Sequence, residues 1–241
     1  MVNWKMFGVS VIGPGHVRAG FPNQDAFAAS ESSQHDCLVV SDGVGSAARS
    51  DIGSRMVCAA VREAMERLVS DGRSFDAATF VMDVKDGFLR KISPMTSREC
   101  AATCLFAMRH AGCLSVGLLG DGVVAVQKSD GAMEILCDDK AGSFSNMVAA
   151  LSEETRPEEW KTLVLPESAC RAVVLCTDGV GDDLKDVSGF MSGLVGEYAT
   201  KDVSASVREI RSMLENWPTP KHTDDKTIAC MFRKEASHGG V

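Results

Sequence analysis

The chain contains the stretch CLVVSDG at residues 37–43, where a run of apolar residues ends in an aspartate followed by a glycine. The stretch RAVVLCTDG at residues 171–179 repeats this arrangement. A near-continuous apolar run is typical of an interior strand buried on both faces, and Asp-Gly is common in the turns that end strands. The sequence therefore predicts two interior strands that each hold an aspartate, Asp42 and Asp178, at one end.

Further aspartates occur in similar places, at Asp121 in the stretch LLGDG and at the pair Asp224-Asp225 just before an apolar run. One such aspartate alone would be read as an ordinary turn. Several carboxylates brought to one end of a sheet would instead repel one another and shift one another's pKa values, and a divalent cation relieves this repulsion. Mg²⁺ and Mn²⁺ take oxygen ligands, so the repeated pattern predicts a site for such ions.

Hydrophobic periodicity predicts the remaining elements and the fold class. Helix blocks are separated from strand blocks, which favours an α+β fold with antiparallel sheets over a doubly wound parallel sheet. We expect one domain over residues 1–241, with 235–241 as a frayed tail. The strands from 103 to 137 are expected to form a meander, and 138–166 has no clear pattern. The expected strands are 7–12, 37–41, 103–108, 114–119, 123–127, 133–137, 171–176 and 227–232, the expected helices are 51–72, 76–92 and 203–217, and 13–22 is expected to be a loop.

Composition narrows the class of protein. The formal net charge is −8 and there is no clustered basic block, which argues against nucleic-acid binding. No apolar run approaches the roughly 18–20 residues of a membrane span, and the N-terminus does not resemble a signal peptide. The nine cysteines are scattered without a CxxC pair, which favours free thiols in a reducing compartment over disulfides or a zinc site. We therefore expect a cytoplasmic protein that binds neither nucleic acid nor membranes.

Six short motifs follow one another along the chain: GHVR through NQDA (15–26), SDGVGS with SDIG (41–53), AAT (101–103), GDG (120–122), CTDGV (176–180) and DDKT (224–227). In this order they resemble the metal-dependent type-2C protein phosphatases, the PPM family, and most closely its bacterial branch. The resemblance implies two stacked antiparallel β-sheets flanked by α-helices, an α/β/β/α four-layer sandwich. It also implies a metal centre in a cleft at one end of the sandwich.

Roles for matching residues follow from the same resemblance. Asp42 would bridge two Mg²⁺ or Mn²⁺ ions, with the Gly43 carbonyl as a further ligand. Asp25 would support metal-bound water, and Asp121 would belong to a third, weaker metal site. Asp224 would be a metal ligand, or Asp225 in its place if the last motif aligns one residue later. The implied metal residues are Asp42, Gly43, Asp178, Asp224, Asp25, Asp121 and Asp225, and the implied catalytic residues are Asp42, Asp178, Asp25 and Arg18.

Three positions depart from the family pattern. Gln24 stands where a glutamate often precedes the first-motif aspartate, and Val44 stands where some members have a histidine that protonates the leaving group. Arg18 is the nearest candidate for the phosphate-binding arginine, although it lies seven residues before Asp25. His16 either faces the cleft or is a structural loop histidine, and the structural interpretation is favoured.

The function implied by the resemblance is metal-dependent hydrolysis of phosphoserine and phosphothreonine on proteins by a metal-bridging hydroxide, without a covalent intermediate. The enzyme would be a monomer that opposes a Ser/Thr kinase. Two alternatives remain: a pseudophosphatase that binds phosphoproteins without cleaving them, and an unrelated cation-binding regulatory domain. Ligand types alone do not separate Mg²⁺ from Mn²⁺.

Overall fold

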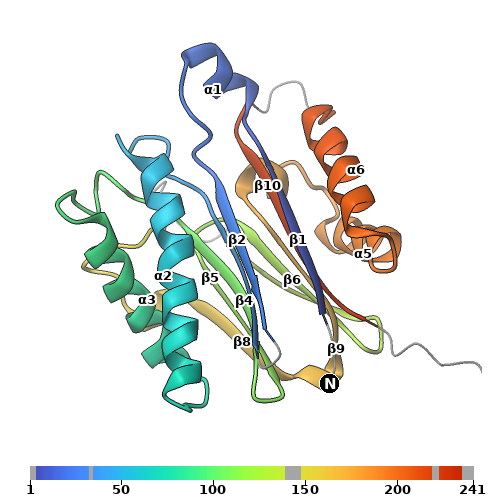
Figure 1. Cartoon of the computed structure of the whole chain (residues 1–241). Helices are drawn as coiled ribbons and strands as arrows, with labels where there is room; N and C mark the ends of the chain where they lie inside the picture. The colour runs from blue at the N-terminus through green and yellow to red at the C-terminus, as the bar shows by residue number, and fades with distance from the viewer. Residues whose placement is uncertain (1–3, 33–34, 139–147, 219–222, 235–241) are drawn as a thin grey trace, which may run out of the picture.

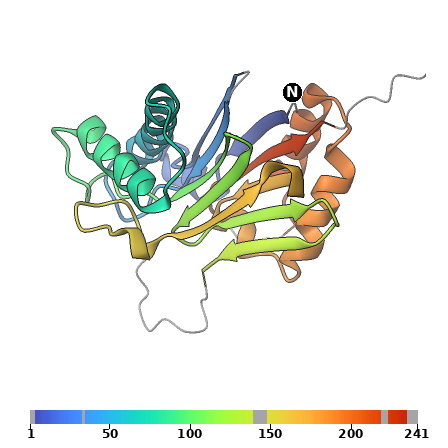
Figure 2. The same ribbon diagram turned by 90° about the horizontal axis from the view of Figure 1, so that it is seen from below.

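Two five-stranded antiparallel sheets pack face to face, with helices on both outer faces (Figures 1 and 2). The structure is a computed structural model that describes residues 4–32, 35–138, 148–218 and 223–234. Sheet A consists, in spatial order, of β1 (Trp4–Val11), β10 (Lys226–Arg233), β9 (Cys170–Cys176), β6 (Val123–Lys128) and β7 (Met133–Cys137). Sheet B consists of β2 (Ala26–Glu31), β3 (His35–Ser41), β4 (Cys104–His110), β5 (Cys113–Leu119) and β8 (Lys161–Pro166).

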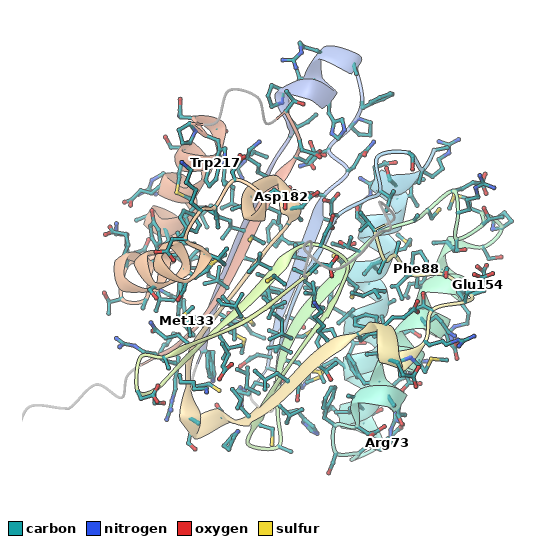
Figure 3. The ribbon with its side chains drawn as sticks, turned by 180° about the vertical axis from the view of Figure 1, so that it is seen from behind. Arg73, Phe88, Met133, Glu154, Asp182 and Trp217 are labelled. Atoms are coloured by element: carbon teal, nitrogen blue, oxygen red, sulfur yellow. The ribbon has the colours of Figure 1, made fainter. Side chains whose placement is uncertain are left out.

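The outer faces of the two sheets are covered by different helix pairs. Figure 3 shows Phe88 and Trp217, which belong to the two helical layers, on opposite sides of the sandwich. The α/β/β/α architecture expected from the resemblance is therefore confirmed. Sheet B carries α2 (Ser50–Ser70) and α3 (Ala77–Ile92), sheet A carries α5 (Val187–Tyr198) and α6 (Val203–Glu215), and the short elements are α1 (Pro14–Ala19), α4 (Asp178–Gly181) and the 3₁₀ turns Pro157–Glu159 and Glu167–Ala169. None of the helices in the described ranges is long and apolar enough to cross a membrane.

The continuous apolar runs in β3 and β9 arise because each strand packs on both faces. In β3, Leu38 and Val40 point into the core between the sheets, while Cys37 and Val39 pack against the helices on sheet B. All four residues are fully buried, and burying a side chain of this size contributes about 1.5–3 kcal/mol. Both strands lie inside their sheets, as the sequence predicts. Strands packed on two sides give the residues at their ends a fixed position.

Two predictions about the first third of the chain were wrong. The expected loop 13–22 contains α1, because Pro14 stands at its first turn and Gly20 ends it with a φ of 71°. These two residues are helix start and stop signals as well as loop signals. The edge strand β2 was missed, because its alternation rests on small residues such as Ala26 and Ala28 that carry little hydrophobic signal.

The expected meander is also wrong, because the chain changes sheets in its middle. β5 belongs to sheet B, whereas β6 pairs with β7 and β9 in sheet A. The change occurs at Gly120–Gly122, where Gly120 has a φ of 113° that a residue with a side chain rarely adopts. Asp121 is thereby placed at a corner between the two sheets. The unassigned stretch 138–166 contains β8, while its residues 139–147 and the tail 235–241 lie outside the described ranges.

All nine cysteines are free, as the sequence predicts. Most are buried in the apolar core, and burial raises the pKa of the Cys37 thiol to about 12. Since the thiolate is the reactive form, such thiols are inert packing residues. The chemistry of the protein therefore has to come from other side chains.

Candidate metal centre

The aspartates that follow the apolar strands meet in one cavity of about 130 Å³. One of its lining residues, His16, belongs to α1, and α1 lies at one end of the sandwich (Figure 1). The residues lining it are His16, Gln24, Asp42, Gly43, Val44, Gly45, Thr103, Asp121, Val148, Asp178 and Asp224. Both sheets contribute, so the cavity exists only because the sheets are stacked.

Asp42 is held at the end of β3 by the next strand of sheet B. Thr103 Oγ1 accepts a hydrogen bond from the Asp42 backbone N–H at 2.9 Å, and the Thr103 N–H donates to the Asp42 carbonyl at 2.8 Å. Gly43 follows in an isolated bridge to Ala102. Its N–H donates to the Gln24 carbonyl at 3.1 Å. The Asp-Gly step is therefore fixed by strands on both sides.

Asp178 approaches Asp42 from sheet A, as the first residue of α4 directly after β9. Burial raises the pKa of Asp42 well above its usual range, and the charges of Asp25, Asp178 and Asp224 add to this shift. Asp42 and Asp178 line the same cavity. Buried carboxylates this close repel one another when both are ionised, so the arrangement favours a cation between them.

The donor set fits divalent cations. Oδ1 of Asp178 is buried and has no hydrogen-bond partner within the described part of the chain. A buried carboxylate oxygen without a partner is costly unless an ion or water meets it. Carboxylate and carbonyl oxygens are the ligands that Mg²⁺ and Mn²⁺ prefer. Asp42, Asp178 and Asp224, together with the Gly43 carbonyl, could therefore hold such ions, while Asp121 lines the same cavity.

Asp25 lies behind this group and does not line the cavity. Its Oδ2 accepts hydrogen bonds from the hydroxyls of Thr177, at 2.9 Å, and Thr227, at 2.7 Å. Burial raises the pKa of Asp25 to about 7, the two hydroxyls oppose this rise, and the charges of Asp225 and Asp178 add to it. When ionised, Asp25 adds to the negative charge near Asp42 from a buried position.

This pKa predicts how the stability of the metal-free protein depends on pH. The folded protein keeps the Asp25 proton up to about pH 7, whereas the unfolded chain loses it near 3.8. The stabilising contribution of that proton is complete below 3.8 and is lost as the pH rises through 7. Each pKa unit corresponds to about 1.4 kcal/mol, or roughly 3–6 °C in Tm for a chain of this size.

Asp25→Asn removes the titrating group and supplies the check. In EDTA, the Tm of the variant minus the Tm of the native protein should become more positive between pH 5 and pH 8. Differential scanning fluorimetry at four pH values measures this difference. A difference that stays constant over the whole range would contradict the raised pKa.

Asp224 and Asp225 are separated in role by their positions. Asp224 lines the cavity, whereas the Asp225 carboxylate is 1% exposed and faces inward. Asp225 Oδ1 accepts the Gly13 N–H and Oδ2 accepts the Gln24 N–H, both at 2.6 Å. Asp225 thus ties the residues before β10 to the segments on either side of α1. Within this ambiguous pair, the positions of the side chains favour Asp224 as the residue that faces the cavity.

The cavity also includes His16 and Gln24. His16 faces it rather than serving only as a structural loop residue, and the buried Gln24 Oε1 has no hydrogen-bond partner among the described residues. Arg18, on the same short helix as His16, is exposed and does not line the cavity. Its role as a phosphate anchor stays a prediction. Because α1 has only six residues, it shows no hydrophobic periodicity from which the inward position of His16 could have been predicted.

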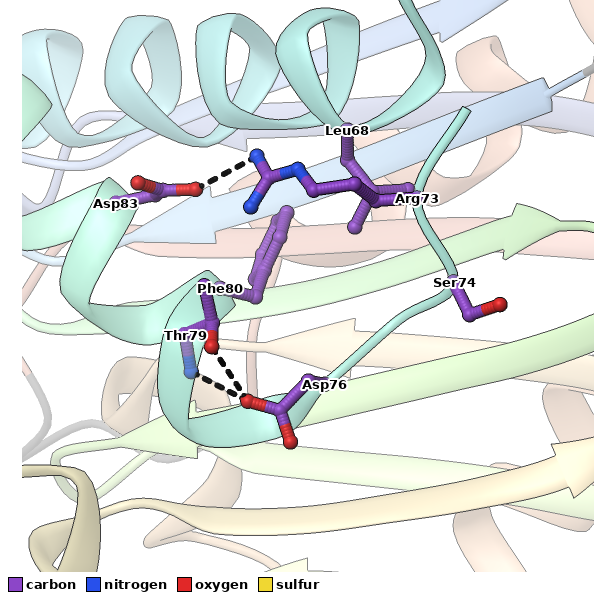
Figure 4. Close-up of a pocket in the computed structure, with 7 residues that line it drawn as sticks. All are labelled: Leu68, Arg73, Ser74, Asp76, Thr79, Phe80 and Asp83. Atoms are coloured by element: carbon purple, nitrogen blue, oxygen red, sulfur yellow. Dashed lines mark hydrogen bonds and ion pairs between the residues drawn. The ribbon is translucent and has the colours of Figure 1, made fainter. Parts of the chain in front are cut away.

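A second cavity, of about 300 Å³, lacks this chemistry. It lies where the α2–α3 connection crosses the start of α3 (Figure 4). Its charged groups are satisfied internally, since Arg73 pairs with Asp83 at 3.1 Å and the Asp76 side chain accepts the Thr79 N–H at 2.9 Å. These contacts cap α3 and hold the connection in place. The aspartate cavity is thus the better candidate for a functional site.

Comparison with known sequences identifies one family. The sequence profile described as Protein phosphatase 2C matches residues 12–215 of this chain. The matched range contains Asp25, Asp42, Asp121 and Asp178 and ends before the Asp224-Asp225 pair. No curated protein sequence matches the chain.

Comparison with solved structures finds the same architecture at low sequence identity. The photosystem II phosphatase PBCP has a TM-score of 0.71 at 14% identity, covering 96% of this chain and 99% of that one. The serine/threonine phosphatase Stp1 from Staphylococcus aureus has a TM-score of 0.68 at 12% identity, with 98% and 96% covered. The catalytic domain of the serine/threonine protein phosphatase PstP, in complex with two manganese ions, has a TM-score of 0.64 at 15% identity, with 98% and 100% covered. At these identities the likeness shows the fold.

Proposed function

The chain belongs to the protein phosphatase 2C family, and we propose that it hydrolyses phosphoserine and phosphothreonine on proteins with divalent cations held by Asp42, Asp178 and Asp224. The observation that carries this proposal is the meeting of the three aspartates from both sheets in one cavity. The likeness to PstP, which was crystallised with two manganese ions, supports two Mg²⁺ or Mn²⁺ ions at this centre. Asp121 is the candidate ligand for a third, weaker ion.

The side chains of the protein would hold the cations and fix their positions. Asp42 is fixed by Thr103 and lines the same cavity as Asp178, so both could bind the same ion. Bound divalent cations supply water with a lowered pKa and positive charge opposite the phosphoryl oxygens. Asp25 is buried behind Asp42, where Thr177 and Thr227 hold its carboxyl in place. Val44 has no acidic proton, so solvent or a metal-bound water would have to protonate the leaving seryl or threonyl oxygen.

Phosphorylated proteins are the proposed substrates, and a Ser/Thr kinase would supply them. A cavity of about 130 Å³ has room for a phosphate group but not for the neighbouring residues of a folded substrate. This suits a phosphorylated residue that is presented on a flexible segment. We further propose that residues 1–241 act as one catalytic domain, in the cytoplasm and as a monomer. Size-exclusion chromatography with light scattering measures the last point.

The proposal is tested by turnover. Protein purified in EDTA should be inactive toward a phosphothreonine peptide and should regain activity with Mn²⁺ or Mg²⁺, measured as released phosphate. An aryl phosphate serves as a second substrate that needs no peptide contacts. Activity that survives complete removal of metal would overturn the proposal. Phosphopeptide binding without turnover at saturating metal would instead identify a pseudophosphatase.

A further inference from the structure

We propose that His16, Asp224 and Asp225 form a cation site of their own beside the cluster around Asp42, with a nitrogen ligand from His16. Each of the three residues offers one ligand atom, and these atoms lie within 4.8 Å of one another. His16 and Asp224 both line the cavity, while Asp225 supports them from inside. The proposed function uses Asp224 but leaves His16 without a role.

The ion-pair contact between His16 and Asp225 has a spacing that two ligands of one ion also have. His16 Nδ1 lies 2.9 Å from Asp225 Oδ2. Yet Nδ1 is buried and has no hydrogen-bond partner among the residues that the structure describes. Two ligands at about 2.1 Å from one ion, at right angles to each other, are about 3 Å apart. The separation of the two atoms is therefore compatible with a shared ion.

The scaffold holds His16 in this position. The Gly15 N–H donates to the Thr223 carbonyl at 2.8 Å, which fixes the start of α1 against the segment before Asp224. A Cβ at Gly13 would lie 2.3 Å from backbone atoms of the same segment, so the two segments touch without space for a side chain. The His16 side chain is 18% exposed. A ligand pre-positioned in this way loses little conformational freedom when an ion binds.

Gln24 provides an independent argument for an ion in this cavity. Its side chain is 8% exposed and lines the same cavity, and its Oε1 finds no hydrogen-bond partner in the described ranges. The Gln24 backbone N–H meanwhile donates to Asp225, so the residue belongs to the same cluster. A buried amide oxygen without a partner requires a water or an ion to offset its desolvation.

A nitrogen ligand has a consequence for the choice of metal. Mg²⁺ prefers oxygen ligands in near-ideal octahedral geometry, whereas first-row transition ions accept imidazole. The site should therefore bind Mn²⁺ in preference to Mg²⁺, which the aspartates alone would not ensure. The inference rests on the proposed function only for its biological use, because ion binding can be measured without turnover.

The experiment compares metal-free native protein with His16→Ala and with His16→Gln, which keeps a polar side chain. His35→Ala is the matched control, since His35 begins β3 about 20 Å from the aspartate end of that strand. Pulsed electron paramagnetic resonance of the Mn²⁺-loaded protein should show a ¹⁴N coupling in the native protein and in His35→Ala. The coupling should be absent from both His16 variants. Isothermal titration should show one Mn²⁺ site weakened at least about tenfold in both, with Mg²⁺ binding changed much less.

A ¹⁴N coupling that persists in the His16 variants, or Mn²⁺ affinities equal to the native values, would overturn the proposal. Circular dichroism of the metal-free variants establishes that they are folded, and either His16 variant suffices for the test. Failure of this inference is distinguishable from failure of the proposed function. If the native protein hydrolyses phosphopeptides but shows no ¹⁴N coupling, only the histidine site is wrong.

Discussion

Asp178→Asn should lower kcat on a phosphothreonine peptide by at least about 10²–10³-fold, the loss expected when one preorganised electrostatic group is removed from a site. The substitution keeps the shape of the side chain but removes the charge that meets Asp42 and the cation. In the metal-free protein it also relieves a repulsion, because the charge of Asp178 raises the pKa of Asp42. The variant should therefore be inactive while its metal-free Tm equals or exceeds that of the native protein.

The combination of the two readouts makes this test specific. Phosphate release measures activity, and fluorimetry in EDTA measures stability. Asp86→Asn is the matched control, because Asp86 is exposed on α3, far from the cavity, and should change neither readout. Near-native turnover of Asp178→Asn would show that Asp178 is not a ligand. A large fall in Tm would show that its role is structural.

Gly179→Ala should damage both the fold and the site. A Cβ at this position would lie 1.9 Å from the Asp225 carbonyl oxygen, a backbone atom that cannot move without displacing the start of β10. Overpacking of this kind costs about 1–3 kcal/mol, or roughly 2–4 °C of Tm per kcal/mol. Because the displaced segment carries Asp224, its distance from Asp178 must also change. We expect lower Tm, weaker metal binding and loss of most turnover.

Gly193→Ala provides the comparison for this substitution. Gly193 lies within α5, and a Cβ there would meet no atom of the described residues within 4 Å. Replacing a helical glycine by alanine stabilises by about 0.5–1 kcal/mol, so this variant should melt at a higher temperature and retain activity. If Gly179→Ala were as stable and as active as Gly193→Ala, the close approach of α4 to β10 would not matter for the site.

The carboxylate cluster explains why fold and site are linked in this protein. Burial and mutual repulsion raise the pKa values of Asp25, Asp42 and Asp224. Charged groups in such surroundings destabilise the folded protein unless protons or cations neutralise them. Bound metal should therefore stabilise the fold as well as serve catalysis, and the core between the sheets provides the rigidity that keeps the carboxylates together.

The local sequence was sufficient for the features that depend on a few neighbouring residues. The apolar runs before Asp42 and Asp178 predicted interior strands with aspartates at their ends, because a strand buried on both faces has no room for polar residues until it leaves the core. The α3 helix was predicted over 76–92, and the structure places it at Ala77–Ile92 with Asp76 as its N-cap. The motif order identified the family and, through it, the four-layer fold.

The sequence by itself determined that aspartates lie at strand ends, because hydrophobic patterning acts within each strand. Only the tertiary structure decided which side chains share the cavity. His16 and Asp225 meet across the chain because β1 and β10 are paired in one sheet, and Asp25 is held by Thr227 across a separation of 202 residues. The change of sheet at Gly120–Gly122 likewise depends on which faces pack together. Contacts of this range arise from the burial of whole sheet faces, which no local pattern records.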